Sequence, residues 1–179
     1  MSILSDGDLE RVWPGATAQP ASIDLHLGDR VLWWPEWVTR DPRADQSDQW
    51  RVLPISDGLW TLRPGLRYLA ATRARVTLPD DLVGLVAARS SWGRDGLAVI
   101  QGPAGVVDPG WSGRLTLELS VVGSPLVVWP GARVAQLLVA RLETPARRPY
   151  RGKYQGDDGV VPSRTHLDGD VPAAAGVAS

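Results

Sequence analysis

Three Pro-Gly pairs occur in the middle of this 179-residue chain. They stand at Pro64-Gly65, Pro109-Gly110 and Pro130-Gly131, each shortly before a run of β-prone residues. Proline presets φ at the second position of a turn, and glycine supplies the positive φ that the third position requires. Turns at this spacing argue against βαβ units, which need a long crossover connection. We therefore expect an all-β chain, in a meander or a jelly-roll-like sheet.

The composition supports this class and narrows the chemistry. The chain has 19 Gly and 15 Pro but no Phe and one Met, which favours short strands and turns over long helices. It has no cysteine, which removes disulfides, thiol nucleophiles and cysteine-ligated zinc. The only imidazoles are His26 and His166, so a catalytic zinc would need carboxylate ligands and is disfavoured.

Charge and hydropathy give no sign of a polyanionic or membrane partner. The formal net charge is -1, so we expect no binding to nucleic acid or to an anionic membrane. The N-terminus lacks the basic and apolar regions of a signal peptide, and no apolar run reaches membrane-spanning length. These features predict a cytoplasmic protein. The length suits one domain, which we place at residues 1–164; the patternless segment 165–179 is expected to be a disordered tail.

Local patterns place several elements. Ser5 to Val12 is predicted to be a short helix capped by Ser5, with Asp6 and Asp8 at its positive end. Residues 22–28 alternate apolar and polar side chains, which predicts a half-buried strand whose polar face is exposed to solvent. Residues 38–50 are charged and poorly patterned and indicate a surface loop. Residues 126–129 and 134–139 are predicted to be an apolar pair of strands around the Pro130-Gly131 turn. The tryptophans between residues 33 and 60 have no assigned role beyond covering the barrel or a subunit contact.

A cluster of hydroxyls and guanidiniums lies at residues 89–94. Arg89, Ser90, Ser91 and Arg94 stand beside Gly93 and Gly96, a composition that suits phosphate oxygens. Taken alone, the cluster fits a turn with solvated arginines equally well.

Two carboxylates follow. Asp108 precedes a Pro-Gly turn, where an aspartate most often bonds its own backbone. Glu118 lies in mid-strand between Leu117 and Leu119, on the polar face, where it is either solvated or a catalytic base. Asp24 is interpreted as an ordinary polar-face residue. The segment Tyr150-Arg151-Gly152-Lys153-Tyr154-Gln155-Gly156 suits closure over phosphates, although its composition also fits a basic linker.

Together these segments resemble the dCTP deaminase branch of the dUTPase-like superfamily, especially its bifunctional dCTP deaminase/dUTPase members. The matching blocks include residues 3–6, 19–25, 89–94, 104–110, 117–120, 129–131 and 153–156, ending at Ser163-Arg164. The resemblance implies a distorted β-barrel or jelly-roll subunit with short helices. It also implies a homotrimer with active sites between subunits, Mg²⁺ bound with the nucleotide triphosphate, and deamination without zinc.

The resemblance also assigns roles. Glu118 would be the general base for water attacking C4 of cytosine, with Ser90 and Arg94 positioning that water. Asp108 would bind the 3′-hydroxyl and help activate water in a dUTPase-like second step. The remaining substrate and phosphate contacts would come from residues near these groups: Arg89, Ser91, Ala104, Gly105, Val106, Tyr150, Lys153 and Gln155.

Three departures from the family pattern keep other substrates open. The hairpin between Gly96 and Asp108 is one residue longer, Pro103 replaces a threonine, and Asp157 replaces a glutamine after Lys-Tyr-Gln-Gly. A carboxylate near a triphosphate repels it unless Mg²⁺ or Lys153 intervenes. The alternatives are a dUTPase-like pyrophosphohydrolase, a paralogue acting on another pyrimidine nucleotide, and a non-catalytic nucleotide-binding regulator.

Overall fold

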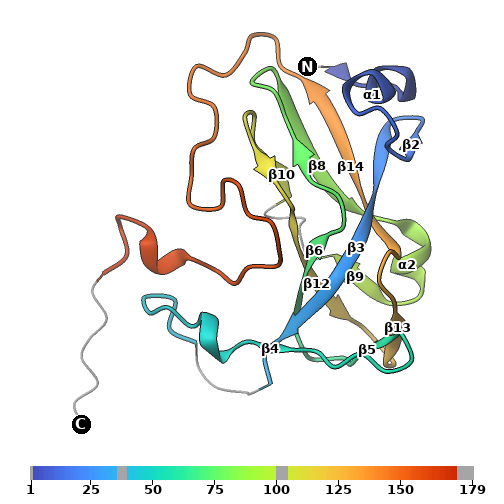
Figure 1. Ribbon diagram of the computed structural model, residues 1–179, viewed down its shortest axis with the longest axis vertical. Coiled ribbons are helices and arrows are strands. Elements are labelled where there is room, and N and C mark those ends of the chain that lie inside the picture. The colour runs from blue at the N-terminus through green and yellow to red at the C-terminus, as the bar shows by residue number, and fades with distance from the viewer. Residues whose placement is uncertain (1, 36–39, 100–104, 173–179) are drawn as a thin grey trace.

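The computed structural model describes residues 2–35, 40–99 and 105–172, and it is dominated by strands (Figure 1). The strands of the main sheet are β1 (Ser2–Ile3), β2 (Ala18–Gln19), β3 (Ser22–Trp33), β4 (Arg51–Val52), β6 (Tyr68–Thr72), β8 (Leu82–Ala88), β9 (Leu97–Val99), β10 (Val106–Val107), β12 (Thr116–Val121) and β14 (Arg133–Arg141). Four further strands form two small sheets: β5 (Trp60–Leu62), β7 (Val76–Thr77), β11 (Ser112–Gly113) and β13 (Leu126–Val128). The helical elements are short: α1 (Asp6–Val12), α2 (Ser90–Arg94), η1 (Ser47–Gln49) and η2 (Thr165–Leu167).

The main sheet is antiparallel and runs in the order β10-β8-β14-β3-β6-β12-β9. Its long central strand β3 changes partner along its length, because residues 23–26 pair with β14 whereas residues 27–33 pair with β6. The registers shift between Leu27 and Val31 and between Arg133 and Ala135. Such irregularities bend strands and increase their twist. The sheet consequently curls, and β3 crosses it diagonally in Figure 1.

The core lies inside this curl and includes the small sheets. β12 has the predicted alternation, with Leu117 and Leu119 fully buried and Glu118 on the other face. Trp60 and Val128, from the β5–β13 pair, are also fully buried against the core. The predicted all-β class with a distorted, curled sheet is confirmed.

The three Pro-Gly pairs lie in turns, as predicted. Gly65, Gly110 and Gly131 have φ values of 81°, 83° and 83°, as the third position of a type II turn requires. The predicted N-terminal helix is confirmed as α1, with both acidic residues in its first turn. Ser5 stands at the N-cap position, but its hydroxyl donates to Asp8 Oδ2 at 3.2 Å and makes no cap to the backbone.

Two strand predictions need correction. Segments 126–129 and 134–139 both contain strands, but they do not pair with each other: β13 pairs with β5, whereas β14 pairs with β3, β8 and β1. The Pro130-Gly131 turn therefore carries the chain from one sheet to another. The polar side of residues 22–28 is not wholly wet, because Ser22 and Asp24 are 6% and 4% exposed. Residues 40–50 form the expected loop; residues 38 and 39 of that prediction lie outside the described residues.

After β14 the chain leaves the sheet as an irregular segment, residues 142–172, which we call the C-terminal arm. In Figure 1 it follows the side of the molecule away from α1 and α2. The tail predicted from residue 165 begins differently, because η2 forms there and Asp168 Oδ1 lies 2.6 Å from Lys153 Nζ. Residues 173–179 lie outside the described residues. None of the described helices is long and apolar enough to cross a membrane.

Candidate active site

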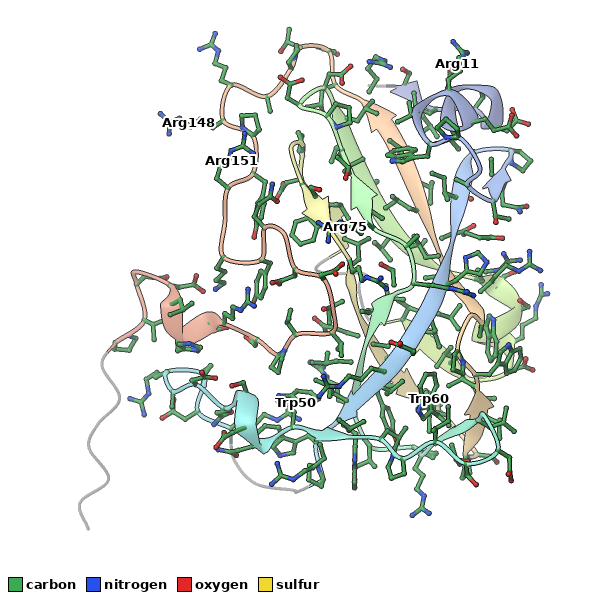
Figure 2. The ribbon with its side chains drawn as sticks, viewed as in Figure 1. Arg11, Trp50, Trp60, Arg75, Arg148 and Arg151 are labelled. Atoms are coloured by element: carbon green, nitrogen blue, oxygen red, sulfur yellow. The ribbon has the colours of Figure 1, made fainter. Side chains whose placement is uncertain are left out.

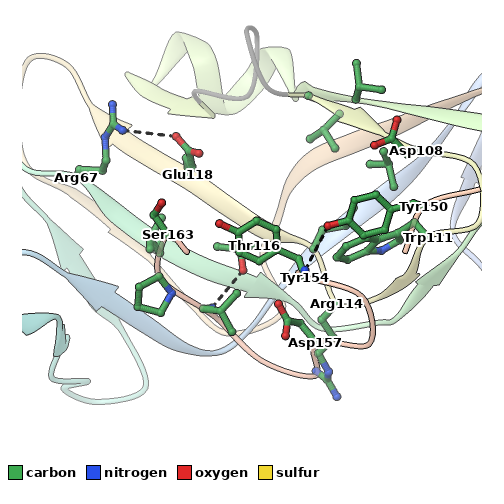
Figure 3. A pocket seen from close by; sticks show the side chains of 18 of the residues that line it. Arg67, Asp108, Trp111, Arg114, Thr116, Glu118, Tyr150, Tyr154, Asp157 and Ser163 are labelled. Carbon is green, nitrogen blue, oxygen red and sulfur yellow. Dashed lines mark hydrogen bonds and ion pairs between the residues drawn. The ribbon is translucent and has the colours of Figure 1, made fainter. Parts of the chain in front are cut away.

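A pocket of about 400 Å³ lies between the outer face of β6 and β12, β10 and the C-terminal arm. We call it the sheet pocket, and Figure 3 shows its lining. Acidic and basic side chains both face it, among them Asp108, Glu118, Arg67 and Arg114. Arg114 is neutralised by Asp158, whose Oδ1 lies 3.1 Å from Arg114 Nε. The sheet pocket therefore holds both carboxylates and guanidiniums.

Glu118 reaches the sheet pocket because of strand alternation. It stands opposite Leu69 of β6, on the face away from the buried leucines. Its side chain is 34% exposed, and its Oε2 lies 3.6 Å from Nη1 of Arg67. The carboxylate is thus open to a ligand and to water, as a general base must be.

Asp108 lies in the same pocket, directly after β10. Its backbone carbonyl accepts a hydrogen bond of 3.1 Å from the Trp111 amide, which closes the turn. Within the described ranges, no group donates to its carboxylate, so the usual turn role of aspartate is not what this side chain performs. Gly105 and Val106 also line the pocket. Ala104 and the altered hairpin around Pro103 lie outside the described residues.

The hydroxyl and guanidinium cluster lies elsewhere. Arg89, Ser90 and Ser91, at the junction of β8 and α2, line a second pocket of about 360 Å³ together with Gln136. We call it the α2 pocket. Arg94 is the last residue of α2 and is absent from the described lining of both pockets. In Figure 1, α2 and the C-terminal arm lie on opposite sides of the molecule. In one copy of the chain, the lining of the pocket that Glu118 faces therefore does not include Ser90 or Arg94.

Asp24 is a residue of the α2 pocket whose importance the sequence did not reveal. Its side chain has no exposure, and its two carboxylate oxygens pair with Arg89 and Arg133, the latter at 3.3 Å. Gln19 Nε2 donates to it at 3.3 Å. A buried carboxylate is stable only when it is paired in this way. Asp24 therefore fixes the guanidinium of Arg89 at the edge of the pocket.

The C-terminal arm closes one side of the sheet pocket. Tyr150 lines it and packs on Trp111, with ring centroids 5.5 Å apart. Gln155 fastens the arm to the turn after β10: its Oε1 accepts from the Ser112 amide at 3.2 Å, and its Nε2 donates to the Gly110 carbonyl at 2.9 Å. A Cβ on Gly110 would lie 2.5 Å from Cβ of Pro149, so the arm also approaches the turn closely.

Two charged residues of the arm are engaged within it. Lys153 binds Asp168 and is not part of the described pocket lining. Asp157 faces the sheet pocket, but Arg164 holds it through contacts of 3.1 and 3.2 Å. The cation beside Asp157 is therefore Arg164, and not the Lys153 that the sequence suggested.

Arg67 and Arg40 are pocket residues that the sequence analysis missed. Arg67 lies two residues before Leu69 and therefore on the same face of the sheet. Only the register of β6 with β12 shows that its neighbour is Glu118. Arg40 stacks on Trp34 and Trp50 at 4.2 and 5.0 Å from the ring centroids. Burial and, secondarily, the charge of Arg67 lower the pKa of Arg40. Trp34 and Trp50 thus hold a pocket arginine, a role more specific than covering the barrel.

Sequence comparison decides the family. The family model described as dCTP deaminase-like matches residues 4–142. The chain belongs to the dCTP deaminase-like family. It is 43% identical over 157 residues to the "dCTP deaminase, dUMP-forming" of Persephonella marina, covering 85% of each chain. It is 41% identical over 183 residues to the protein of the same name from Mycobacterium avium, covering 92% of this chain and 96% of that one.

A solved structure agrees with this dCTP deaminase-like assignment. The crystal structure of 2′-deoxycytidine 5′-triphosphate deaminase from Agrobacterium tumefaciens superposes with a TM-score of 0.60 at 26% identity. The match covers 77% of this chain and 47% of that chain, so the dCTP deaminase-like chain spans about half of that protein's length.

Proposed function

We propose that this protein deaminates dCTP to dUTP and ammonia, and then hydrolyses dUTP to dUMP and pyrophosphate. The observation that carries the proposal is Glu118, a partly exposed carboxylate that faces a nucleotide-sized pocket from a strand whose neighbouring residues are buried. The names of the relatives, dUMP-forming dCTP deaminases, support both the substrate and the second step.

In the first step, Glu118 acts as the general base. Its carboxylate takes a proton from a water molecule as the water oxygen bonds to C4 of cytosine. The electron pair of the C4=N3 bond moves to N3 as the water oxygen bonds to C4. The proton held by Glu118 passes to the amino group, the C4–N4 bond breaks and ammonia leaves, and the hydroxyl proton moves to N3. The resulting base is uracil, so the balance is dCTP plus water to dUTP plus ammonia. Ser90 and Arg94 are proposed to position the water and to stabilise the charge that develops on the base.

In the second step, Asp108 assists attack on the α-phosphate. Its carboxylate faces the sheet pocket and is free of partners among the described residues, so it can accept a proton from a second water. That water bonds to the α-phosphorus while the bond to the bridging oxygen breaks, which releases pyrophosphate from dUTP. The ion pair of Asp157 with Arg164 lowers the repulsion that this carboxylate would otherwise exert on the phosphates.

A complete site requires a second copy of the chain. Glu118 and Asp108 line the sheet pocket, whereas Arg89, Ser90 and Ser91 line the α2 pocket. We expect the α2 pocket of one copy to meet the sheet pocket of the next, and we expect a closed trimer to repeat this contact. Arg89 and Ser91 would then bind phosphates from the neighbouring copy.

Mg²⁺ fits this scheme as a partner of the nucleotide. Within the described residues, no cluster of three or more His, Asp or Glu side chains is placed to hold a metal ion. Phosphate oxygens of the nucleotide, and not protein side chains, would coordinate the Mg²⁺ ion. The ion would in turn neutralise phosphate charge. Lys153 and Gln155 would contribute to the closed arm around it.

Product analysis over a nucleotide panel tests the proposed function. Purified protein with Mg²⁺ is incubated separately with dCTP, dUTP, dCMP, CTP and dATP, and the products are identified by mass spectrometry. We expect ammonia and dUMP from dCTP, and pyrophosphate from dUTP. Conversion of dUTP without any deamination of dCTP would replace the proposal by the pyrophosphohydrolase alternative. Tight binding of a nucleotide without turnover would make the protein a regulator.

A further inference from the structure

Arg67 is placed beside Glu118 by the pairing of β6 with β12. Leu69 is the register partner of Glu118, and Arg67, two residues earlier, continues the alternation on the same face. Diagonal neighbours across an antiparallel pair are about 7–8 Å apart, a gap that an arginine side chain can span. Nη1 of Arg67 lies 3.6 Å from Oε2 of Glu118, and a dashed line marks this ion pair in Figure 3.

A second guanidinium directs Arg67 toward this carboxylate. Arg40 is fixed on the rings of Trp34 and Trp50 and lines the same pocket. The charge of Arg67 contributes to the lowered pKa of Arg40, so the two guanidiniums are close enough to repel. Both arginines are exposed, but Arg40 is stacked on two rings, whereas Arg67 lies beside the carboxylate of Glu118. Its favourable position is therefore at Glu118.

The ion pair leaves half of the Glu118 carboxylate available. Among the residues that the structure describes, Arg67 is the one partner of Glu118, and it meets Oε2. At 3.6 Å the contact is longer than the roughly 2.7–2.9 Å of a charge-assisted hydrogen bond. It attracts the carboxylate but does not saturate it, and among the described residues Oε1 has no ion-pair partner.

We infer that Arg67 is a positioning residue for deamination: it holds Glu118 so that Oε1 faces the attacking water. The inference rests on the proposed function, in which Glu118 is the general base. Arg67 acts through Glu118 and need not touch the nucleotide. Its removal should consequently lower kcat more than it changes KM, because ground-state binding does not depend on the contact.

The test compares three arginine variants in the intact protein. Arg67→Met removes the charge at similar length, and Arg67→Lys keeps it. Arg63→Met is the matched control: Arg63 is an exposed arginine in the same β5–β6 connection, and its hydrogen bonds with Tyr68 run through its backbone. Ammonia release from dCTP gives kcat and KM for each, and thermal unfolding reports whether each is folded.

We expect Arg67→Met to lower kcat by about 10–100-fold with KM changed less than about 3-fold, since small misplacements of a reacting group cost this much. Arg67→Lys should recover kcat to within about 5-fold of the wild type, and Arg63→Met should match the wild type. An unchanged kcat in Arg67→Met, a rise confined to KM, or no recovery in the lysine variant overturns the inference. If Arg67→Met fails to fold, Arg67→Gln is judged by the same criteria. Absence of deamination in the wild type would instead refute the proposed function.

Discussion

The buried carboxylate of Asp24 offers a sharp test of how the α2 pocket is built. The perturbation is Asp24→Asn, which keeps the shape of the side chain and removes its charge. The native carboxylate has no exposure and pairs with two guanidiniums, those of Arg89 and Arg133. After the substitution both arginines lose their anion.

The structure sets the size of the effect. Breaking a buried ion pair costs about 3–5 kcal/mol when the remaining charge is trapped. Here the side chains of Arg89 and Arg133 are 26% and 51% exposed, so water can solvate them in part. Asparagine also keeps one acceptor oxygen. Solvation of the two arginines and the retained acceptor lower the expected loss in the free energy of unfolding to about 2–3 kcal/mol. An unfolding entropy of about 2.1 cal/mol/K per residue converts this loss, for 179 residues, to a fall in Tm of roughly 5–8 °C.

The assay is thermal unfolding followed by circular dichroism, with all proteins at one concentration. Asp8→Asn is the matched control, because Asp8 and Arg11 form an ion pair of 2.6 Å whose side chains are 43% and 78% exposed. That pair should contribute less than about 1 kcal/mol. Equal, small shifts in Tm for the two variants would refute the reasoning that Asp24 is a structural anchor for Arg89.

Two further predictions concern the assembly and the arm. Co-refolding equal amounts of Glu118→Gln and Arg94→Met chains should restore about one quarter of the wild-type deaminase activity. With random pairing, about one quarter of the sites between copies combine an intact Glu118 with an intact Arg94. No recovery of activity would contradict a site built from two copies. Gln155→Ala removes the two hydrogen bonds that fasten the arm to the turn at Gly110 and Ser112, so hydrogen exchange of arm amides should accelerate by more than that of β14; equal protection in variant and wild type would show that the arm is held elsewhere.

The sequence predicted those features that depend on neighbouring residues. Strand alternation alone put Glu118 on the face opposite Leu117 and Leu119, and the structure confirms this. The Pro-Gly turns likewise depend on the φ preferences of two residues. The partner of Asp24 is different, because Arg89 lies 65 positions away in the sequence. No local pattern reports that β3 and the residue after β8 will bring these side chains together.

Register and sheet exchange account for the other differences. Arg67 becomes a neighbour of Glu118 only through the pairing of Leu69 with Glu118, and slipping the register by one residue would reverse its face. The strands around Pro130-Gly131 were predicted to pair because adjacent strands usually do. In the structure their turn joins two sheets. The roles of individual site residues remain predictions that the experiments above test.

The most direct test of the central claim is the fate of dCTP with Glu118→Gln. Glutamine keeps the size of the side chain but is not a base, so ammonia release should fall by at least about 100-fold while the nucleotide still binds. Isothermal titration with dCTP and Mg²⁺ measures that binding on the same preparation. Loss of ammonia release with retained binding is the result that the account predicts. Undiminished ammonia release from dCTP by the folded variant would contradict it.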